Sequence, residues 1–481
     1  MAVISWYSGV RWPDTEIRAG SLSQMKVLIV SFAFPPSNVI GAVRVGKLAR
    51  YLDQRGHDVR VLATDLVEDR SLPLEISRER IVYSEYRERR HWLERTTPSL
   101  RRRTAAHGSV RSEHLRRQVS ARAAWLRQTV RRHYLGLIHI PDQRASWIRT
   151  AIPAGRRLIE EAKPEIIFAS APPHTGLIIA SRLAHAYKIP WVADFRDLWV
   201  DNPYYGEPNW RRYVDAVLER LVLRRAAGLV TVSPVWAEQL RRRHGKAAAV
   251  VYNGYAEEDF PRLAARVDGG ETLTIRYMGS IYRGFRDPSA LFSAIASLPE
   301  QLRSRISVEF FTDAGDVIRD AAVAHRVESA VAVKPFIPYR QALERQMEAD
   351  VLLLLQSTDR RDEGNLPAKL FEYLYARRPI LFLGYEHGIA ARLVIERGAG
   401  FVSNRPAEIS HQLERWLEDK RAGRLEPLHQ SVSLGLSRDD QYAKLERFFL
   451  DILENRLDTA DRLPLGEVRP INQTGVPRGR L

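Results

Sequence analysis

Short apolar runs separated by helix-length amphipathic segments recur along most of this chain. Such alternation is typical of parallel sheets covered by helices, because a chain leaving a parallel strand needs a crossover to return to the same end of the sheet. We therefore predict an α/β fold with two doubly wound domains. The expected strands are Val27–Ser31, Val59–Ala63, Ile166–Ser170, Trp191–Asp194, Leu229–Val232, Ala249–Tyr252, Leu273–Met278, Ser307–Phe311, Val351–Leu355, Ile380–Leu383 and Gly400–Val402.

Turn signals and composition indicate where the two domains meet and where they end. Asn253-Gly254 closes the sixth expected strand and precedes a polar stretch, so the seam is predicted near residue 255. Residues 1–24 are polar and contain glycine, and we expect no packed element in this extension, which makes Met25 a candidate for the native start. The proline-containing tail over 457–481 is expected to be mobile.

The composition excludes several classes of protein. The chain has no cysteine, so it holds neither a disulfide framework nor a thiolate nucleophile or metal ligand. Apolar runs of 18 residues or more are lacking, and the first 24 residues have no signal-peptide core. We therefore expect a cytoplasmic protein without a membrane-spanning helix.

Positive charge is concentrated in one part of the sequence. The whole chain carries +16, and Arg78–Arg132 holds 16 arginines, no lysine and 5 glutamates, a local net charge of +11. We predict basic helices there, within an insertion over about 70–135. A solvated face, an anionic membrane surface at the inner side of the cell membrane and a nucleic acid are three open interpretations. No nucleic-acid-binding motif is present, so a nucleic acid partner is not expected.

Polar side chains follow the expected strands of the first half, at the sheet edge where open α/β sheets bind ligands. A glycine at a helix start admits a phosphate, and the other side chains can position an acceptor hydroxyl. A plain loop, a satisfied histidine and an ion-pair network fixing the loop are the structural alternatives. The candidates are Gly41, Arg44, His174, Asp194, Arg196, Asp197 and Trp199.

In the second half, a loop and a helix supply candidates for binding a diphosphate. The amides of Gly279 and Ser280 and the guanidinium of Arg283 or Arg286 suit an anion. Lys369 and Glu372 are three residues apart at a predicted helix start before a buried strand, so they are neighbours on one helical face. Lys369 would complete a two-cation clamp. Paired metal-ligand carboxylates after a strand are lacking, as are His-Glu-x-x-His and Gly-x-Ser-x-Gly, so neither a metal nor a serine nucleophile is expected.

Six segments, named at the end of this paragraph in their order along the chain, together resemble the bacterial family 4 glycosyltransferases of GT-B fold. They are most similar to the branch that builds surface polysaccharides. The resemblance covers about 25–450. It implies two Rossmann-like domains facing across a cleft: an acceptor domain over 25–255, a nucleotide-sugar domain over 256–440 and a helix over 441–456 that crosses back. The segments are VLIVSFAFPPSNVIGAVRVGKLARYLDQRGHDVRVLAT, SAPPHT, DFRDLW, VYNGYAEEDF, the loop over 279–286 and PAKLFEYLYARRPIL.

The resemblance also implies roles for particular residues. Glu372 matches the second glutamate of the family's Glu-(seven residues)-Glu motif, which binds the nucleotide ribose. The first glutamate falls on Gly364, so the backbone amides of Gly364, Asn365 and Leu366 are expected to replace it. Lys369 with Arg283 or Arg286 resembles the diphosphate-binding pair. Donor contacts are further implied for Gly41, Arg44, Gly279, Ser280, Phe336 and Ile337.

The activity implied is transfer of a sugar from a nucleotide diphosphate sugar to a glycan or lipid-linked acceptor, with retention of configuration and without a metal or other cofactor. Lys369 and Arg283 would stabilise the departing diphosphate, while His174 and Asp194 would position the reactants. Three alternatives share these motifs or the basic segment: a nucleotide-sugar epimerase of GT-B fold, a pseudo-glycosyltransferase, and a non-catalytic membrane or nucleic-acid binder.

Overall fold

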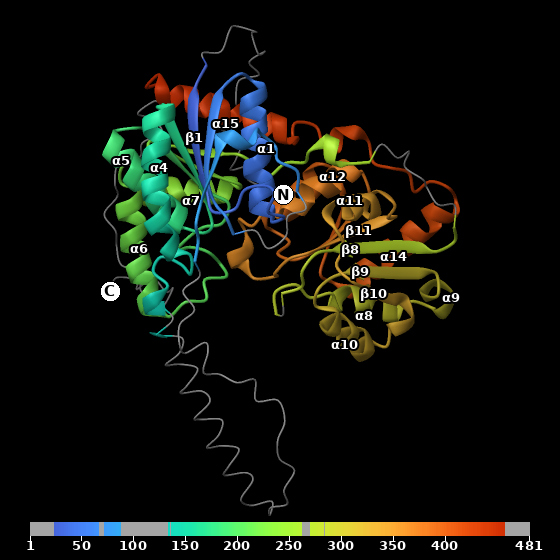
Figure 1. Cartoon of the computed structure of the whole chain (residues 1–481). Helices are drawn as coiled ribbons and strands as arrows, with labels where there is room; N and C mark the ends of the chain where they lie inside the picture. Colours follow the sequence, from blue (N-terminus) through green and yellow to red (C-terminus); the bar gives the residue numbers. More distant parts are fainter. Residues whose placement is uncertain are drawn as a thin grey trace, which may run out of the picture.

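A computed structural model describes residues 24–66, 72–87, 133–134, 136–261, 270–282 and 284–456. The described chain forms two lobes, each built on one parallel sheet (Figure 1). The first sheet has seven strands in the order β3-β2-β1-β4-β5-β6-β7, and the second has six in the order β10-β9-β8-β11-β12-β13. The predicted α/β fold with two doubly wound domains is confirmed.

The N-terminal lobe covers both faces of its sheet with helices, because its strands are apolar on both sides. Helices α4 to α7 pack on one face, and α1 packs on the other together with α15 from the end of the chain. The strands are β1 (Lys26–Ser31), β2 (Asp58–Thr64), β3 (Ile81–Ser84), β4 (Ile166–Ala171), β5 (Trp191–Phe195), β6 (Gly228–Thr231) and β7 (Ala248–Val250). The helices are α1 (Ile40–Gln54), α4 (Ile148–Ala162), α5 (Thr175–Tyr187), α6 (Asn209–Leu223), α7 (Pro234–His244) and α15 (Arg438–Leu453).

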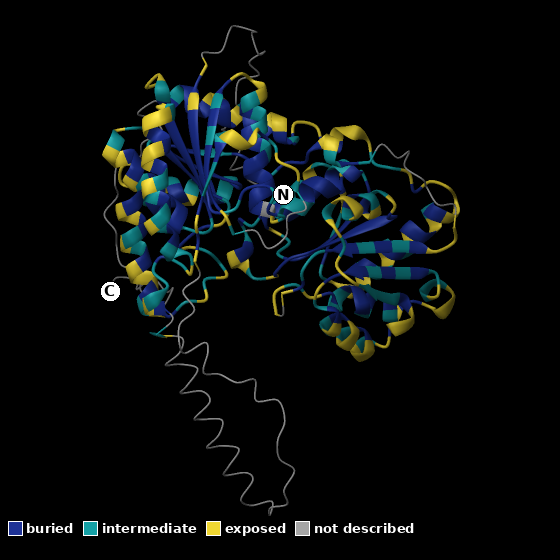
Figure 2. Ribbon diagram, in the orientation of Figure 1, coloured by how far each residue is buried: buried dark blue, intermediate teal, exposed yellow. Residues whose placement is uncertain are grey.

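The C-terminal lobe repeats this layered plan, and its buried residues form the dark interior of Figure 2. Helices α8, α10 and α14 pack on one face of the sheet, and α11, α12 and α13 pack on the other. The strands are β8 (Leu273–Met278), β9 (Ile306–Phe311), β10 (Val331–Lys334), β11 (Val351–Leu355), β12 (Ile380–Leu383) and β13 (Gly400–Val402). The helices are α8 (Ser289–Ser297), α9 (Glu300–Arg303), α10 (Gly315–His325), α11 (Tyr339–Met347), α12 (Ala368–Ala376), α13 (Ile389–Glu396) and α14 (Pro406–Arg421). Short 3-10 helices span Arg78–Arg80, Ala145–Trp147, Glu257–Asp259, Glu328–Ala330, Arg360–Asp362 and Gln430–Val432.

All eleven expected strands are present, but two edge strands were not predicted. Strand β3 lies at the start of the segment predicted as basic helices, so that prediction is wrong for Ile81–Ser84. Strand β10 is only half-buried along its length. The rest of the basic segment, 88–132, lies outside the described residues, as do 1–23 and the tail over 457–481.

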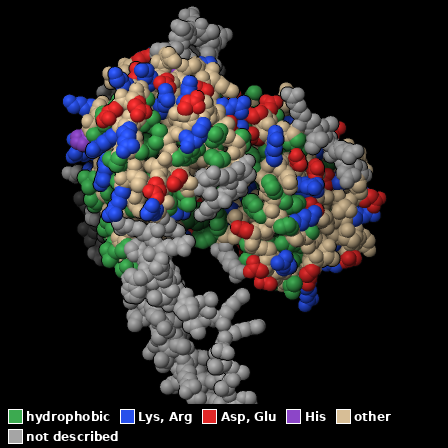
Figure 3. Space-filling view, viewed as in Figure 1, with side chains coloured by type: hydrophobic (Ala, Val, Ile, Leu, Met, Phe, Trp, Pro, Cys, Tyr) green, Lys and Arg blue, Asp and Glu red, His purple; other side chains and the backbone are tan. Residues whose placement is uncertain are grey.

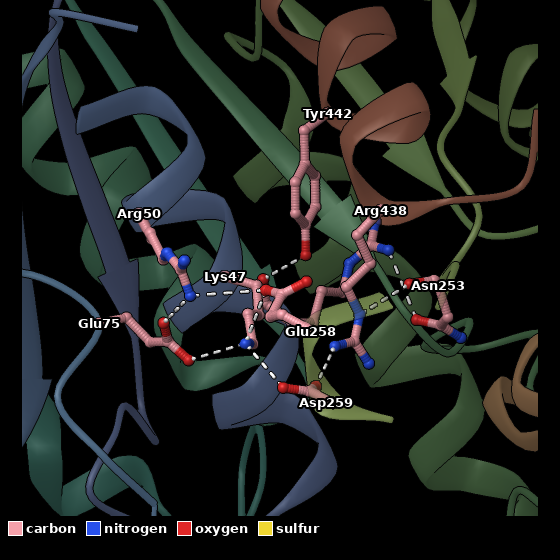
Figure 4. Close-up of polar contacts among 9 residues, drawn as sticks. Lys47, Arg50, Glu75, Asn253, Glu258, Asp259, Arg438 and Tyr442 are labelled. Carbon is pink, nitrogen blue, oxygen red and sulfur yellow. Dashed lines mark hydrogen bonds and ion pairs between the residues drawn. The ribbon is translucent and has the colours of Figure 1, made fainter. Parts of the chain in front are cut away.

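Ion pairs join the end of the first lobe, helix α1 and helix α15 (Figure 4). The Lys47 ammonium lies 3.0 Å from a Glu258 carboxylate oxygen, 2.9 Å from Asp259 and 3.3 Å from Glu75. The Arg438 guanidinium reaches Asp259 at 3.4 Å and the Asn253 carbonyl oxygen at 3.3 Å. The predicted seam is thus clamped between α1 and α15.

Helix α15 begins at Arg438, within three residues of the predicted start, and packs across the N-terminal lobe. Ser437 caps it, with the side chain accepting from the Asp440 amide while Asp440 accepts from Ser437 in return. The Tyr442 hydroxyl donates to the Arg44 carbonyl oxygen at 2.8 Å. At the seam, Gly254 has φ +63°, and a Cβ there would lie 2.9 Å from the Arg438 amide nitrogen, so a side chain is excluded.

Candidate active site

Lys369 lies at the start of α12 and reaches the carboxyl end of β8. Its ammonium donates to the Met278 carbonyl oxygen at 2.7 Å and lies 4.4 Å from the centroid of the Tyr277 ring. Gly279 follows at φ +132°, where a Cβ would lie 2.5 Å from the Lys369 nitrogen. The absence of a side chain at Gly279 therefore makes room for the ammonium, and the structure brings these two predicted site residues together.

Arg286 is the second cation at this position. Its guanidinium donates to the Ser280 carbonyl oxygen at 2.7 Å and lies 4.3 Å from the centroid of the Tyr282 ring. Burial and the nearby Arg286 charge lower the pKa of Lys369 to about 7, while Glu372 opposes this shift. Within the described chain neither Lys369 nor Arg286 forms an ion pair, so a bound anion would relieve their repulsion.

Glu372 is buried one turn further along α12, facing α11. It accepts a hydrogen bond from the Gln346 amide nitrogen at 3.2 Å, and burial raises its pKa. The Gln346 side-chain oxygen and the Tyr339 hydroxyl are buried without a hydrogen-bond partner. This carboxylate thus lies beside polar groups that retain free hydrogen-bonding capacity, as a site for sugar hydroxyls requires.

The segment before α12 packs against the other lobe. A Cβ on Gly364 would overlap the indole of Trp236 and would lie 3.2 Å from the Val235 Cβ, both on α7. The position that lacks the family's glutamate is therefore one where the two lobes approach too closely for a side chain. Asn365 donates to Asp362 at 3.0 Å.

Tyr204 and Asp362 connect the lobes beside the candidate cations, and sequence reasoning missed both. The Tyr204 hydroxyl donates to a buried Asp362 oxygen at 2.8 Å, and its ring meets Phe285 edge-on at 4.9 Å. The other Asp362 carboxylate oxygen is buried without a partner, and burial raises the pKa of this group. Asp362 lies two residues from Gly364 in sequence, whereas nothing in the sequence marks Tyr204.

On the N-terminal lobe, His174 and Trp199 form a flat stack. Their ring centroids are 4.5 Å apart and the planes differ by 1°. Burial and the Arg196 charge lower the pKa of His174 to about 3, so the imidazole is neutral at physiological pH. The His174 Nδ1 and Trp199 Nε1 atoms are buried without partners. The stack therefore offers unused hydrogen-bonding nitrogens.

Arg196 lies between this stack and helix α1. Its guanidinium donates to the Pro172 carbonyl oxygen, and a Cβ on Gly41 would overlap it. The Arg196 Nε atom has no partner, and burial lowers the pKa of the group. Asp197 is exposed beside it. Gly41 thus makes room for the Arg196 side chain, whether or not a phosphate also approaches its backbone.

Residues 41–256 match the family model described as a glycosyl transferase 4-like domain. Over these residues the chain is similar to that family. This match and the fold together confirm the sequence resemblance to family 4 glycosyltransferases of GT-B fold. No curated protein matches the sequence of the chain.

Solved structures with the same fold share little sequence with this chain. Anabaena HepE in complex with UDP is 13% identical with a TM-score of 0.54, and sucrose-phosphate synthase from Thermosynechococcus elongatus is 12% identical with a TM-score of 0.59. Each alignment covers 90% of this chain and 100% of the other. A putative UDP-N-acetylglucosamine 2-epimerase from Listeria monocytogenes is 12% identical, with a TM-score of 0.51 over 91% of this chain and 98% of its own. At these identities the likeness shows the fold alone.

Two predicted site residues of the glycosyl transferase 4-like domain form an internal pair instead of facing a ligand. Asp194 is fully buried. Its carboxylate accepts two hydrogen bonds from the Arg44 guanidinium, at 3.1 and 3.3 Å, and one from the Ser170 hydroxyl at 2.7 Å. Arg44 also donates to the carbonyl oxygens of Val251 and Tyr252, at 3.1 and 3.0 Å. Every polar atom of the Asp194 carboxylate is thus engaged, so the contacts support a structural role for Asp194 and Arg44 and not the predicted roles in catalysis and donor binding.

The remaining predicted residues have less defined surroundings. Arg283 lies outside the described residues. Phe336 is 62% exposed and Ile337 is half-buried, in the loop before α11. Ser280 donates to Asp313 at 3.1 Å, and Leu366 is buried in the C-terminal lobe. The part of the chain that the structure describes contains no group of three or more His, Asp or Glu side chains arranged to hold a metal ion.

Proposed function

We propose that this glycosyltransferase moves a sugar from a nucleotide diphosphate sugar to a glycan or lipid-linked acceptor in polysaccharide biosynthesis, with retention of configuration. One observation carries the proposal: Lys369 and Arg286 lie close together at the carboxyl end of β8, and among the described residues neither forms an ion pair with a carboxylate. Two neighbouring cations of this kind suit a diphosphate. The Anabaena protein of the same fold has been solved with UDP and with UDP-glucose, which supports this choice of donor.

The proposed transition state separates charge, with positive charge on the anomeric carbon and negative charge on the departing diphosphate. Lys369, Arg286 and the amides of the loop from Gly279 would stabilise the diphosphate, because they are held in place before reaction. The acceptor hydroxyl would attack from the face of the leaving group and transfer its proton to a phosphate oxygen. In this scheme no protein nucleophile forms a covalent bond to the sugar.

The N-terminal lobe would hold the acceptor. The neutral His174 ring stacked on Trp199 presents a buried imidazole nitrogen that has no partner in the protein. Arg196 beside it has one unused donor, and Asp197 is exposed. We therefore assign acceptor positioning to this group and do not include Asp194, whose oxygens are fully engaged.

The nucleotide ribose is assigned to the surroundings of Glu372. Its carboxylate lies one helical turn beyond Lys369, so a ligand whose diphosphate contacts Lys369 can place its ribose near Glu372. The unpartnered Tyr339 hydroxyl and Gln346 oxygen could complete the hydrogen bonds of the ribose hydroxyls. The exposed ring of Phe336, in the loop before α11, is available to the base.

The test is a thermal-shift screen with UDP, GDP, ADP and dTDP, followed by transfer assays with the corresponding sugars. A nucleotide present at one hundred times its Kd should add about 2.7 kcal/mol to the free energy of unfolding. Lys369→Met and Glu372→Gln should each abolish most of this stabilisation, because each removes one proposed ligand contact. Lys26→Met, at an exposed lysine of β1, is the matched control and should behave as the wild type. A wild-type chain that none of the four nucleotides stabilises would contradict the proposal.

A nucleotide-sugar epimerase is the second candidate, since the putative Listeria epimerase has the same fold. The two activities differ in their need for an acceptor. An epimerase would change the donor sugar when incubated with it alone, and NMR of the recovered nucleotide sugar would detect the new isomer. A transferase would leave the donor sugar unaltered until an acceptor is added.

A further inference from the structure

Helix α6 presents an apolar stripe to solvent on the outer side of the N-terminal lobe (Figure 1). Tyr213, Val217 and Leu221 are 76%, 61% and 61% exposed, and they follow each other at a spacing of four residues. Val214 beside them is 38% exposed. Figure 2 shows the exposed positions as yellow bands along this helix. Helices of water-soluble lobes normally turn such a stripe toward the core.

The acidic residues of α6 are buried, and they fix this orientation. Asp215 accepts from the Arg211 Nε atom at 2.7 Å and from the Tyr205 hydroxyl at 2.8 Å. Glu219 accepts from the His244 ring at 2.9 Å and from the Val200 amide at 3.2 Å. A rotation that buried the apolar stripe would break these buried polar contacts, so the stripe stays outside.

Positive charge surrounds the stripe. Over residues 209–225 the exposed charged side chains are all arginines, because both acids of the helix are buried. Helix α5, packed beside α6, has no acidic residue. Figure 3 shows blue and green side chains interspersed along the left margin of this lobe. The exposed basic residues of α6 and α5 and of the residues directly after them are Arg212, Arg220, Arg224, Arg225, Arg182, His185 and Lys188.

We propose that this α6 surface, defined by the apolar stripe and its basic rim, docks on the anionic headgroups of a lipid bilayer. An apolar face bordered by arginines is the pattern of helices that lie in a membrane interface, where aliphatic and tyrosine side chains enter the headgroup boundary and cations meet anionic lipid. The proposal rests on residues of α6 and α5 and does not depend on sugar transfer.

Other occupants fit the charge of the α6 surface less well. The chain's own segment over 88–132 holds 13 arginines and 3 glutamates, so it has the same sign as the rim and would be repelled. A second copy of the chain would bring one basic rim against another. An extended anionic surface with an apolar layer beneath it satisfies both the rim and the stripe.

Helix α6 is joined in sequence to a loop that contacts the candidate active site. Helix α6 begins at Asn209, four residues after the loop in which Tyr204 contacts Asp362 and Tyr205 contacts Asp215. The same short segment therefore connects the α6 surface to the acceptor side of the site.

The test is flotation of the full chain with vesicles, without any sugar donor. We expect binding to phosphatidylcholine vesicles that contain phosphatidylglycerol, weak binding to phosphatidylcholine alone, and release by salt. The triple variant Tyr213→Ser, Val217→Ser and Leu221→Ser should reduce the bound fraction at least about tenfold. The matched control is Val323→Ser with Ile395→Ser, which removes equally exposed apolar side chains from the C-terminal lobe and should bind as the wild type.

Three results would overturn the proposal. The first is wild-type protein that stays unbound on anionic vesicles, and the second is a triple variant that binds as well as the wild type. The third is self-association in gel filtration that the triple substitution abolishes, since this would assign the stripe to a second copy. Because Tyr213, Val217 and Leu221 are exposed, the triple variant should keep the thermal stability of the wild type, and a circular dichroism melt verifies that it is folded.

Discussion

Donor binding is expected to weaken as the pH rises above 7, because Lys369 must be protonated to meet a diphosphate. Burial and Arg286 lower the pKa of Lys369 to about 7, from a usual value of 10.5. At pH 8 about one molecule in ten, and at pH 9 about one in a hundred, then carries the ammonium before binding. If the complex holds the proton, each further pH unit raises the Kd about tenfold, which is about 1.4 kcal/mol.

The same pKa shift changes stability with the opposite sign. Between about pH 7 and 10.5 the unfolded chain binds a proton at this lysine that the folded, ligand-free chain does not, so this residue makes the ligand-free protein more stable as the pH rises. Deprotonation of Lys369 at high pH therefore does not unfold the protein, so unfolding through this residue does not explain weaker donor binding. A thermal melt without ligand over the same pH range separates the two effects.

Calorimetric titration of a nucleotide diphosphate sugar at pH 6.5, 7.5 and 8.5 measures the effect. The diphosphate of such a donor is a diester without a proton that titrates near neutrality, so the protein supplies the pH dependence. Repeating the titration in buffers of different ionisation enthalpy should show uptake of nearly one proton at pH 8.5. Lys369→Arg keeps its charge throughout and should flatten the dependence. An affinity independent of pH in the wild type, or an unchanged slope in Lys369→Arg, would refute the reasoning.

Three further predictions concern residues around the site. Arg44→Met should lower the free energy of unfolding by about 3–5 kcal/mol in urea, because Asp194 is then buried without a cation, and adding Asp194→Asn should recover part of it. Gly364→Ala should cost about 1–3 kcal/mol in a thermal melt through overlap with Trp236, and Trp236→Leu in the same chain should relieve it. His174→Gln should not shift the acidic limb of the pH profile of kcat/KM between pH 5 and 8, because the pKa of His174 is about 3 and this residue does not titrate in that range. A shift of the acidic limb in this variant would contradict the prediction.

The core of the fold was predictable because its central strands are buried on both faces. Runs such as Val351–Leu355 are apolar throughout, and apolar periodicity detects such strands. The two missed strands, β3 and β10, lie at sheet edges, where one side of the strand lacks a neighbour. Their sequences, IVYS and VAVK, are short and half-buried, and β3 follows arginines that favoured a helical interpretation.

The candidate site was predictable only in part, for a different reason. The rule that ligands bind beyond the carboxyl ends of strands correctly placed Gly279 near Lys369. It did not distinguish a residue facing a ligand from one facing the interior, so Asp194 was assigned to the site although Arg44, 150 positions away, neutralises it. Contacts across such distances depend on how strands and helices stack, which local patterns do not specify.

Two of the connections between the lobes differ in strength, and this difference indicates which of the two breaks when a donor enters. At the seam, Lys47 has three carboxylate partners, and α15 is embedded in the apolar core of the N-terminal lobe. Beside the candidate cations, Tyr204 contributes one hydrogen bond to a carboxylate and one edge contact with an aromatic ring. Interactions of these two kinds are worth about 1.5–3 and about 0.5–1.5 kcal/mol. The binding free energy of a donor can offset the loss of these two interactions. We therefore expect the lobes to separate near Tyr204 while the seam acts as the hinge.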